Sequence, residues 1–303
     1  MAKFEASKLF SVEKLVAVII GGGSGLGRTM ALALDANGAS KVFVVGRRES
    51  KLQETADLAV NGSVIPVTGD VSSKASIKTA YDRIAQQTDF INLLVVSSGV
   101  AGSPPSPQPR LDGGEHSLIE LQKYLWEDST DGFSNVLHVN VTGSYFAAVA
   151  FLPLLDVANQ RHPAPVSGVL SPPRPQIIIM SSIAAYLRVG VGGYAYHASK
   201  AATNALIKML STSLANYKIR VNGIAAGPYY SEMTANFFDR RDITGQGISE
   251  GSVPKEFIPL TRAGAPEDMA GIILWMAGSA GGFLNGSIVI TDGGRLGVHP
   301  SSA

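Results

Sequence analysis

Residues 15–27 have the sequence LVAVIIGGGSGLG, an apolar run followed directly by a cluster of glycines. A helical pattern then begins and extends over Leu26–Asn37. In a turn between a buried strand and a helix, glycines let backbone N–H groups approach a pyrophosphate at the positive end of the helix. The chain has 33 glycines, so a plain turn is the alternative. The strand before and the helix after favour a dinucleotide site.

The alternation of strand and helix continues along the chain. Short β-branched runs predict further strands at Lys41–Val45, Ser63–Val67, Leu93–Ser97, Gln176–Ser181, Ile219–Ile224 and Ser287–Thr291. Helical periodicity lies between them, at Lys74–Gln86, Phe133–Leu155, Ala195–Asn216 and Glu267–Met276. Near-continuous apolar strands separated by helices are typical of a parallel sheet covered on both faces. We therefore predict an α/β fold, a Rossmann-like, doubly wound parallel sheet of about seven strands with helices on both faces.

Three segments interrupt this alternation. Residues 101–130 are rich in proline and glycine, residues 158–175 contain five prolines, and residues 229–257 are polar with scattered aromatic side chains. None is flanked by a new composition or a repeat that would mark a second domain. We predict a single domain over residues 1–303, with these segments as loops or lids on the substrate side.

The composition excludes several classes of partner. With 25 basic and 24 acidic residues, the chain has no broad basic field that would attract nucleic acid or anionic lipid. The absence of cysteine excludes disulfides and thiolate metal sites, and it is compatible with a reducing cytosol. The first apolar run, Leu15–Ile20, is far shorter than the ~20 residues that span a bilayer. We expect a cytoplasmic protein without a nucleic-acid, membrane or metal partner.

The glycine spacing resembles that of the short-chain dehydrogenase/reductase family, in its single-domain Tyr-x-x-x-Lys type. That family has the pattern Thr-Gly-x3-Gly-x-Gly, and Ile20 stands here in place of the threonine. The resemblance implies that a nicotinamide dinucleotide is held by Gly21, Ser24, Gly25 and Leu26.

The turn after the second predicted strand, Val45-Gly-Arg-Arg48, bears on the choice of cofactor. An NAD site needs a carboxylate here for the ribose hydroxyls, and Gly46 offers none. Arg47 instead presents a charged, planar fork suited to a 2′-phosphate. A solvated basic turn is the alternative. We predict NADP(H) as cofactor, with Arg47 on its phosphate.

Three further segments resemble the family's cofactor site. Gly69-Asp-Val71 matches the acidic residue that binds the adenine amino group, and residues 96–100, VSSGV, resemble an Asn-Asn-Ala-Gly stretch without its asparagines. Residues 227–234 resemble the motif that closes over the nicotinamide, with Ala226 replacing its proline. The resemblance implies cofactor contacts by Asp70, Val71, Ser97, Gly99, Gly227, Tyr229 and Ser231.

Tyr196 and Lys200 are four residues apart, which on a helix places them on one face. Such a pair alone has little weight, but here a predicted strand ends in Met180-Ser-Ser182 before it. This order resembles the family's active site, in which Ser, Tyr and Lys act together. The resemblance extends from Leu15 to the glycine pair at 293–294.

A free phenol has a pKa near 10, too high for efficient proton exchange near neutrality, and an ammonium or an oxidised nicotinamide nearby would lower it. We expect Tyr196 to act as general acid in reduction and as base in oxidation. Lys200 would lower the pKa of Tyr196 and, by resemblance, bind the cofactor with Tyr196 at the nicotinamide ribose. Ser182 would hydrogen-bond the substrate oxygen. Ser181 is the weaker candidate, because a one-residue slip in a strand reverses the face.

By resemblance, Asn140 is the fourth catalytic residue and holds a water of the proton relay. A helix-packing amide is the alternative for this side chain. The neighbouring histidines, His138 and His197, are expected to point elsewhere on their helices.

These residues predict an NADP(H)-dependent carbonyl reductase or alcohol dehydrogenase that transfers hydride between nicotinamide and a small-molecule ketone or secondary alcohol. The family resemblance implies a homodimer or homotetramer. The alternative is a cofactor-binding protein of the same fold with a non-redox role in cyclisation or sensing, for which a broken Ser-Tyr-Lys set would be expected.

The side chains expected around the substrate favour a bulky cyclic ketone of secondary metabolism over a sugar. Packing of a lid or a subunit contact is the equal alternative for them. They are Tyr186, Leu187, Tyr229, Tyr230, Met233, Phe237, Phe238 and Phe257.

Overall fold

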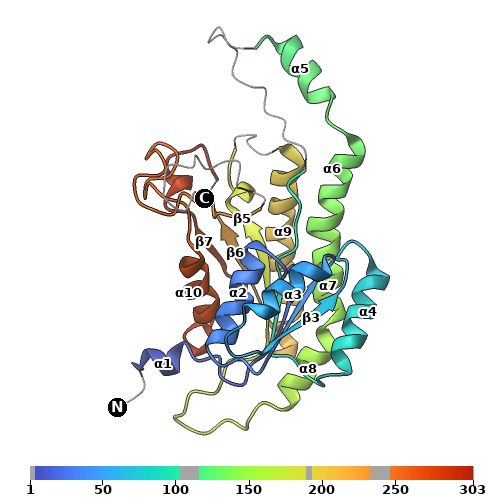
Figure 1. The fold of residues 1–303 in the computed structure, drawn as a ribbon, viewed down its shortest axis with the longest axis vertical. Coiled ribbons are helices and arrows are strands. Elements are labelled where there is room, and N and C mark those ends of the chain that lie inside the picture. The colour runs from blue at the N-terminus through green and yellow to red at the C-terminus, as the bar shows by residue number, and fades with distance from the viewer. Residues whose placement is uncertain (1–3, 103–115, 189–192, 233, 235–245, 303) are drawn as a thin grey trace.

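A single seven-stranded sheet forms the centre of the protein, in the computed structural model that describes residues 4–102, 116–188, 193–232, 234 and 246–302 (Figure 1). All strand pairs are parallel, in the order β3-β2-β1-β4-β5-β6-β7. The strands are β1 Val16–Ile20, β2 Lys41–Gly46, β3 Val64–Thr68, β4 Leu93–Val96, β5 Gln176–Ser182, β6 Arg220–Ala226 and β7 Ile288–Thr291. The predicted fold class is confirmed, and each predicted strand lies within two residues of an observed one.

Burial on both faces explains the unbroken apolar runs. In β1, Val16, Val18 and Ile20 belong to one core cluster, whereas Ala17 and Ile19 belong to the other. Successive side chains of a strand point to opposite faces, so a sheet covered on both sides needs apolar residues at every position. β7 is only partly buried, as expected at an edge of the sheet.

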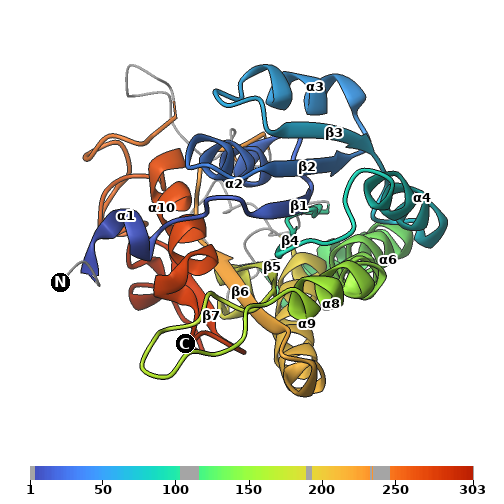
Figure 2. The same ribbon diagram turned by 90° about the horizontal axis from the view of Figure 1, so that it is seen from below.

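Helices cover both faces of the sheet (Figure 2). On one face lie α2 (Gly25–Ala36), α3 (Glu49–Asp57) and α10 (Pro266–Ala277). On the other lie α4 (Lys74–Ala85), α7 (Ser144–Ala150), α8 (Leu152–Gln160) and α9 (Tyr194–Ser213). A short helix, α1 (Ala6–Leu9), precedes β1. This two-sided cover is the doubly wound arrangement that the strand and helix pattern predicts.

The chain from Thr130 to Gln160 is not the single regular helix that was predicted over Phe133–Leu155. It consists of α6 (Thr130–Leu137), a π-helical turn over His138–Gly143, then α7 and α8. By length and composition this stretch could cross a membrane, a test that core helices of soluble proteins also pass. Here it packs against α4 and α9 and buries Phe151 and Leu155 completely.

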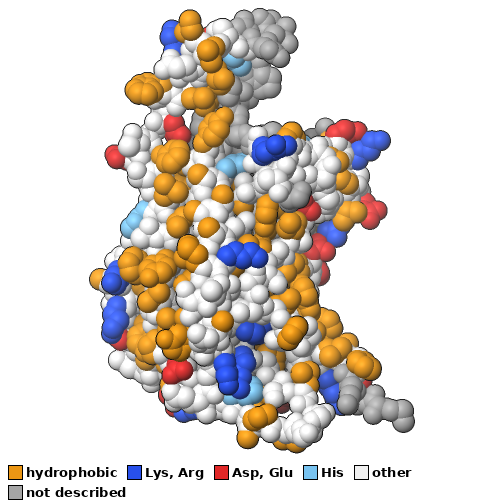
Figure 3. All heavy atoms as spheres, turned by 180° about the vertical axis from the view of Figure 1, so that it is seen from behind, with side chains coloured by type: hydrophobic (Ala, Val, Ile, Leu, Met, Phe, Trp, Pro, Cys, Tyr) orange, Lys and Arg blue, Asp and Glu red, His pale blue; other side chains and the backbone are white. Residues whose placement is uncertain are grey.

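Two of the three predicted lids need correction. Residues 118–126 form a helix, α5, that a Ser117–Glu120 capping box begins, since this local signal outweighs the prolines before it. The prolines themselves lie outside the described residues. None of the residues of α5 is buried, and it projects from the body with Leu118, Ile119 and Trp126 exposed (Figures 1 and 3).

The segment 158–175 does not lie on the substrate side. It completes α8 and leads into the amino end of β5, so it lies at the lower edge of the sheet in Figure 1. In a parallel sheet, the loops at the carboxyl ends of the strands form the ligand site. A loop that leads into the amino end of a strand lies at the opposite edge of the sheet.

We expect two Gly→Ala substitutions in helices to have opposite effects on stability. A Cβ at Gly27, in α2, would lie 2.2 Å from the carbonyl oxygen of Gly21, whereas Gly271, in α10, has open space around it. Gly271→Ala should stabilise the protein by about 0.5–1 kcal/mol. Gly27→Ala should destabilise it by about 1–3 kcal/mol, the usual cost of overpacking. Urea unfolding of both variants measures this, and equal effects would contradict the contact between α2 and the glycine loop.

Candidate active site

A cavity of about 470 Å³ lies at the carboxyl ends of the strands. The strand order reverses between β1 and β4, and such switch points are where ligands bind in open α/β sheets. All but one of the site residues predicted from the sequence line this cavity, and Asn140 is the exception. Those that line it are Gly21, Ser24, Gly25, Leu26, Arg47, Asp70, Val71, Ser97, Gly99, Ser182, Tyr196, Lys200, Gly227, Tyr229 and Ser231.

The glycine loop forms one end of the cavity. The Gly21 N–H donates to the Val45 carbonyl oxygen over 2.7 Å, and a Cβ at Gly21, where φ is +89°, would lie 2.7 Å from the Ser98 nitrogen. Ser24 is the N-cap residue of α2, whose first turn holds no acidic side chain. The unpaired N–H groups and the positive end of α2 therefore remain suited to an anion such as a pyrophosphate.

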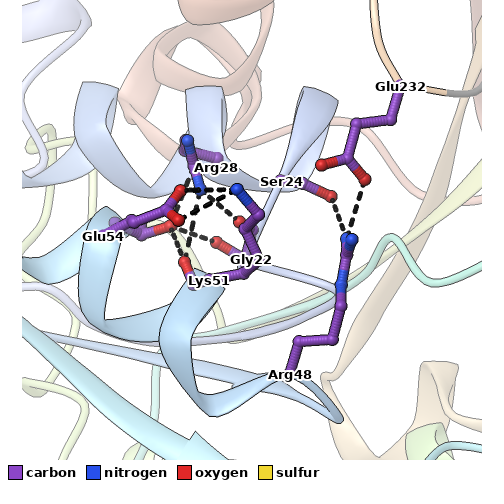
Figure 4. A network of polar contacts seen from close by, with 9 residues as sticks. Gly22, Ser24, Arg28, Arg48, Lys51, Glu54 and Glu232 are labelled. Carbon is purple, nitrogen blue, oxygen red and sulfur yellow. Dashed lines mark hydrogen bonds and ion pairs between the residues drawn. The ribbon is translucent and has the colours of Figure 1, made fainter.

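Basic side chains gather beside this loop, and they include more than the predicted Arg47. Arg48 donates to the Ser24 hydroxyl over 3.2 Å and forms an ion pair of 2.8 Å with Glu232 (Figure 4). Lys51 lines the same end of the cavity and is paired with Glu54 at 2.9 Å. Arg48 and Lys51 are three residues apart at the start of α3 and so share a face, a signal that the sequence analysis did not use.

Asp70 follows β3 and remains a carboxylate. Burial raises its pKa, but hydrogen bonds from Ser72 and the charge of Arg47 outweigh this, so the pKa of Asp70 is lowered overall. The Ser72 N–H and hydroxyl both reach one Asp70 oxygen, at 2.9 and 2.7 Å. Asp70 therefore presents negative charge at the end of the cavity where Arg47 lies.

Asn140 lies in the π-helical turn, and its side chain joins two segments of the site. Its Nδ2 donates to the Val100 carbonyl oxygen and to the Ser199 hydroxyl, both over 3.0 Å, and its Oδ1 accepts from the Val100 N–H over 2.9 Å. The side chain thus joins the segment after β4 to α9. This is the packing role that was the alternative to holding a water of the proton relay. A Cβ at Gly99 would lie only 3.2 Å from Asn140 Oδ1, so glycine leaves the space that this arrangement needs.

Tyr196, Lys200 and Ser182 come together at the other end of the cavity. Lys200 is buried on α9, its Nζ donates to the Met180 carbonyl oxygen over 2.9 Å, and the same atom lies 5.7 Å from the centre of the Tyr196 ring. The Ser182 side chain faces the Tyr196 phenol closely enough to oppose the rise of its pKa. Ser181 donates instead to Asn204 Oδ1 over 2.5 Å. The geometry therefore brings Ser182, rather than Ser181, to the phenol.

Burial moves the two pKa values of this group in opposite directions. It raises the pKa of the Tyr196 phenol, and the Ser182 side chain only partly offsets this. It lowers the pKa of the Lys200 ammonium from 10.5 to about 8. In the protein chain alone, the pKa of Tyr196 thus shifts opposite to the expected direction, because desolvation disfavours both charged forms.

The segment after β6 contains one correction. Tyr229 is buried, its hydroxyl lies 2.6 Å from the Thr291 hydroxyl, and its ring lies against Gly264, so the ring is part of the core rather than a substrate contact. Ser231 lies against Gly25 and so brings this segment to the glycine loop. The Gly227 N–H donates to the Thr291 carbonyl oxygen over 2.8 Å.

Of the other side chains expected around the substrate, Leu187 and Phe257 line the cavity. Tyr186 and Tyr230 do not line the cavity. Three further residues lie outside the described residues: Met233, Phe237 and Phe238.

The two histidines differ. His138 Nε2 lies 2.8 Å from the Ser72 carbonyl oxygen, away from the cavity as expected. His197 lines the cavity, which corrects the expectation that it faces elsewhere. Within the described ranges, no group of three or more His, Asp or Glu side chains could hold a metal ion.

Comparisons with known proteins agree with this geometry. Residues 15–242 match the family model of the short chain dehydrogenases. The chain is 42% identical over 298 residues to the short-chain dehydrogenase/reductase PhomF' of Diaporthe leptostromiformis, covering 98% of this chain and 96% of the relative. It is 28% identical over 287 residues to a rhamnolipids biosynthesis 3-oxoacyl-[acyl-carrier-protein] reductase of Pseudomonas aeruginosa, covering 94% and 97%.

Among solved structures, the Pseudomonas aeruginosa RhlG/NADP active-site complex superimposes with a TM-score of 0.75 at 27% identity, over 95% of this chain and 98% of that one. Membership of one family therefore explains both the sequence match and the structural features. These features are the glycine loop, the pair of Tyr196 and Lys200, and the parallel sheet of seven strands. The chain belongs to the short-chain dehydrogenase/reductase family of oxidoreductases.

Proposed function

We propose that this protein is an NADP(H)-dependent oxidoreductase that transfers hydride between nicotinamide and a ketone or secondary alcohol. The observation that carries the proposal is the grouping of Ser182, Tyr196 and Lys200 in the cavity that the glycine loop closes at its other end. A non-redox binding protein of this fold would have no need to keep all three.

Each residue of the group has a distinct task in reduction. When bound in this cavity, the nicotinamide would supply the hydride for the carbonyl carbon. The Ser182 hydroxyl donates a hydrogen bond to the carbonyl oxygen, where negative charge develops. Tyr196 donates its phenolic proton to the same oxygen, and in oxidation it accepts that proton. The Lys200 ammonium stabilises the phenolate so formed and binds the nicotinamide ribose.

Asn140 is a positioning residue in this proposal. Its amide fixes the segment after β4 against Ser199, one residue before Lys200. Because Ser199 also donates to the Tyr196 carbonyl oxygen over 2.7 Å, Asn140 helps to hold the turn of α9 that carries both Tyr196 and Lys200. The proton relay through a water held by Asn140 remains part of the proposal.

Several observations support NADP(H) as the cofactor. Arg47, Arg48 and Lys51 line the end of the cavity next to Gly46, which offers no carboxylate to repel a 2′-phosphate. Asp70 lines the cavity close enough to Arg47 for their charges to interact, and we propose that it binds the adenine amino group. The structure of RhlG, a similar protein, is described as a complex with NADP.

For the substrate, we propose a bulky ring ketone or its alcohol, of the kind met in secondary metabolism. Support comes from apolar side chains that line the cavity, among them Leu187 and Phe257. We further propose a cytoplasmic homodimer or homotetramer that binds neither nucleic acid nor membrane. Lys and Arg side chains are scattered over the face in Figure 3 rather than gathered in one patch, which supports the absence of nucleic-acid and membrane binding.

Tyr196→Phe should lower kcat by roughly 10²–10⁴-fold, the usual contribution of a general acid, and leave cofactor affinity nearly unchanged. Stopped-flow NADPH oxidation with a ring ketone measures turnover, and fluorescence titration measures cofactor binding. Tyr194→Phe is the matched control, because Tyr194 is exposed on the same helix. Near-normal turnover of Tyr196→Phe would remove Tyr196 from the mechanism.

Gly46→Asp combined with Arg47→Ser should shift the preference toward NADH by about tenfold to a hundredfold, since a hydrogen bond to a charged group is lost and a repelling carboxylate is gained. A Cβ at Gly46 meets only the end of the Leu52 side chain, at 3.3 Å, so the substitution fits with a small shift. Comparison of kcat/KM for NADPH and NADH measures the shift, and Arg83→Glu, which makes the same change of net charge at an exposed site away from the cavity, controls for net charge. A native enzyme that already prefers NADH would refute this assignment.

Cofactor binding should weaken as pH rises through about 8, because the Lys200 ammonium deprotonates there. The dissociation constant of NADP⁺, titrated at a series of pH values, should be constant below that pH and increase above it. Lys200→Met should bind weakly at every pH and lose the transition. Lys208→Met, on the same helix but away from the cavity, should keep it. An unchanged transition in Lys200→Met would show that another group titrates.

A further inference from the structure

Arg295 is a cavity residue that neither the sequence analysis nor the proposed function uses. It begins a short turn, Arg295–Gly297, after β7, its side chain is only 5% exposed, and it lines the cavity. Asp292 builds the tight turn before it, accepting from the Gly294 N–H over 2.9 Å and the Leu296 N–H over 2.8 Å. This turn reverses the chain at the carboxyl end of β7 and so brings Arg295 back over the sheet.

The chain after Arg295 is attached to the loop that follows Ser182. The Arg188 N–H donates to the Pro300 carbonyl oxygen over 2.9 Å, and the Ser302 N–H donates to the Tyr186 carbonyl oxygen over 2.8 Å. A β-bridge joins Leu187, a cavity residue, to Ser301. Arg295 therefore belongs to the substrate end of the cavity, with Ser182, and not to the glycine loop.

A single aromatic residue holds the guanidinium in place. The Arg295 guanidinium lies 3.5 Å from the centre of the Phe257 ring, and its Nη1 donates to the Phe257 carbonyl oxygen over 3.1 Å. These two contacts fix the plane of the group while occupying only part of its donors. The remaining donors are pre-oriented, which lowers the entropy lost when they bind a planar partner.

The charge of Arg295 has no partner at ion-pair distance among the described residues. Burial lowers the pKa of Arg295 and the charge of Asp292 raises it, but a guanidinium stays protonated in proteins. In the described part of the chain, His299 Nε2 is the sole fully buried side-chain nitrogen or oxygen without a hydrogen bond. The Arg295 donors that form no hydrogen bond are therefore not fully buried, and they retain access to the cavity that Arg295 lines. A buried cation without a counter-ion is costly, and an anionic ligand would offset that cost.

We propose that Arg295 binds a carboxylate of the substrate, so that the substrate class is a ring ketone that also carries a carboxylate. This inference rests on the proposed function for the ketone and adds the anionic group. A guanidinium fork matches the two oxygens of a carboxylate in one plane. Leu187, which lines the same cavity, supplies apolar surface for the ring of the substrate. Arg295 is thus a specificity-determining residue, and Tyr196 and Ser182 keep the chemistry.

The test compares two ring ketones of nearly equal shape, 1-tetralone-7-carboxylate and 1-tetralone-7-carboxamide, with NADPH. The native enzyme should have a higher kcat/KM for the acid, mainly through KM. Arg295→Gln should lower the acid-to-amide ratio by about tenfold to a hundredfold, the value of a hydrogen bond to a charged group. Arg295→Lys, which keeps the charge without the fork, should give an intermediate ratio. If Arg295 only clamps Phe257 and the chain end, both ketones lose activity together and the ratio stays fixed, which overturns the proposal.

Arg188→Gln is the matched control for charge. Arg188 is exposed on the loop bonded to the chain end, and it does not line the cavity, so its loss should leave the ratio unchanged. A ratio that falls equally in Arg188→Gln would show a long-range charge effect and would overturn the proposal. The Arg295→Lys variant and the native acid-to-amide ratio decide the question even if Arg295→Gln does not fold.

A binding measurement separates this inference from the proposed function. Benzoate is titrated into the NADP⁺-loaded native protein and into the Arg295→Gln and Arg295→Lys variants by calorimetry. Binding that weakens with the loss of Arg295, in a protein that reduces neither ketone, would reject the proposed function and keep the anion site. Reduction of both ketones with no preference for the acid, together with benzoate binding that does not depend on Arg295, would reject the anion site and keep the proposed function.

Discussion

The close contact between the start of α2 and the end of β1 is the constraint from which the rest of the site follows. No side chain fits there, because a Cβ at Gly27 would lie 2.2 Å from the Gly21 carbonyl oxygen and a Cβ at Gly21 would meet the Ser98 backbone. The helix can therefore begin directly above the sheet, between the β2 and β4 ends. The cavity extends from this contact across the carboxyl ends of the strands to Tyr196 and Lys200. Glycine at these two positions fixes both the fold and the anion site.

The strands could be predicted from the sequence because their physical requirement is local. A parallel strand buried on both faces needs an unbroken apolar run, and each of the seven runs predicted to be strands became one. The π-helical turn at His138–Gly143 could not be predicted, since it continues the apolar pattern of a regular helix. The place of residues 158–175 depends on which end of β5 they join, which composition alone does not reveal.

The site was predictable to the extent that its residues follow strand ends or share a helix. Tyr196, Lys200 and Ser182 satisfy this, and so does Asp70. Other features depend on contacts between distant segments. The pairing of Arg48 with Glu232 joins residues 184 positions apart, and Tyr229 turns into the core because Thr291 offers a hydroxyl partner. No local pattern carries that information, because the first contact joins the segments after β2 and β6, and the second needs β6 and β7 side by side.

The attachment of the chain end to the loop after β5 also sets the order in which the site is completed during synthesis. Strands β1 to β4 and the glycine loop are made first, and α9 follows with Tyr196 and Lys200. Residues 295–302 leave the ribosome after every strand of the sheet, and only then does the wall beside Leu187 close. Domains generally fold from the N-terminal side as they are synthesised. A nascent chain would thus contain the glycine loop and the helix with Tyr196 and Lys200 before the cavity wall beside Leu187 is complete.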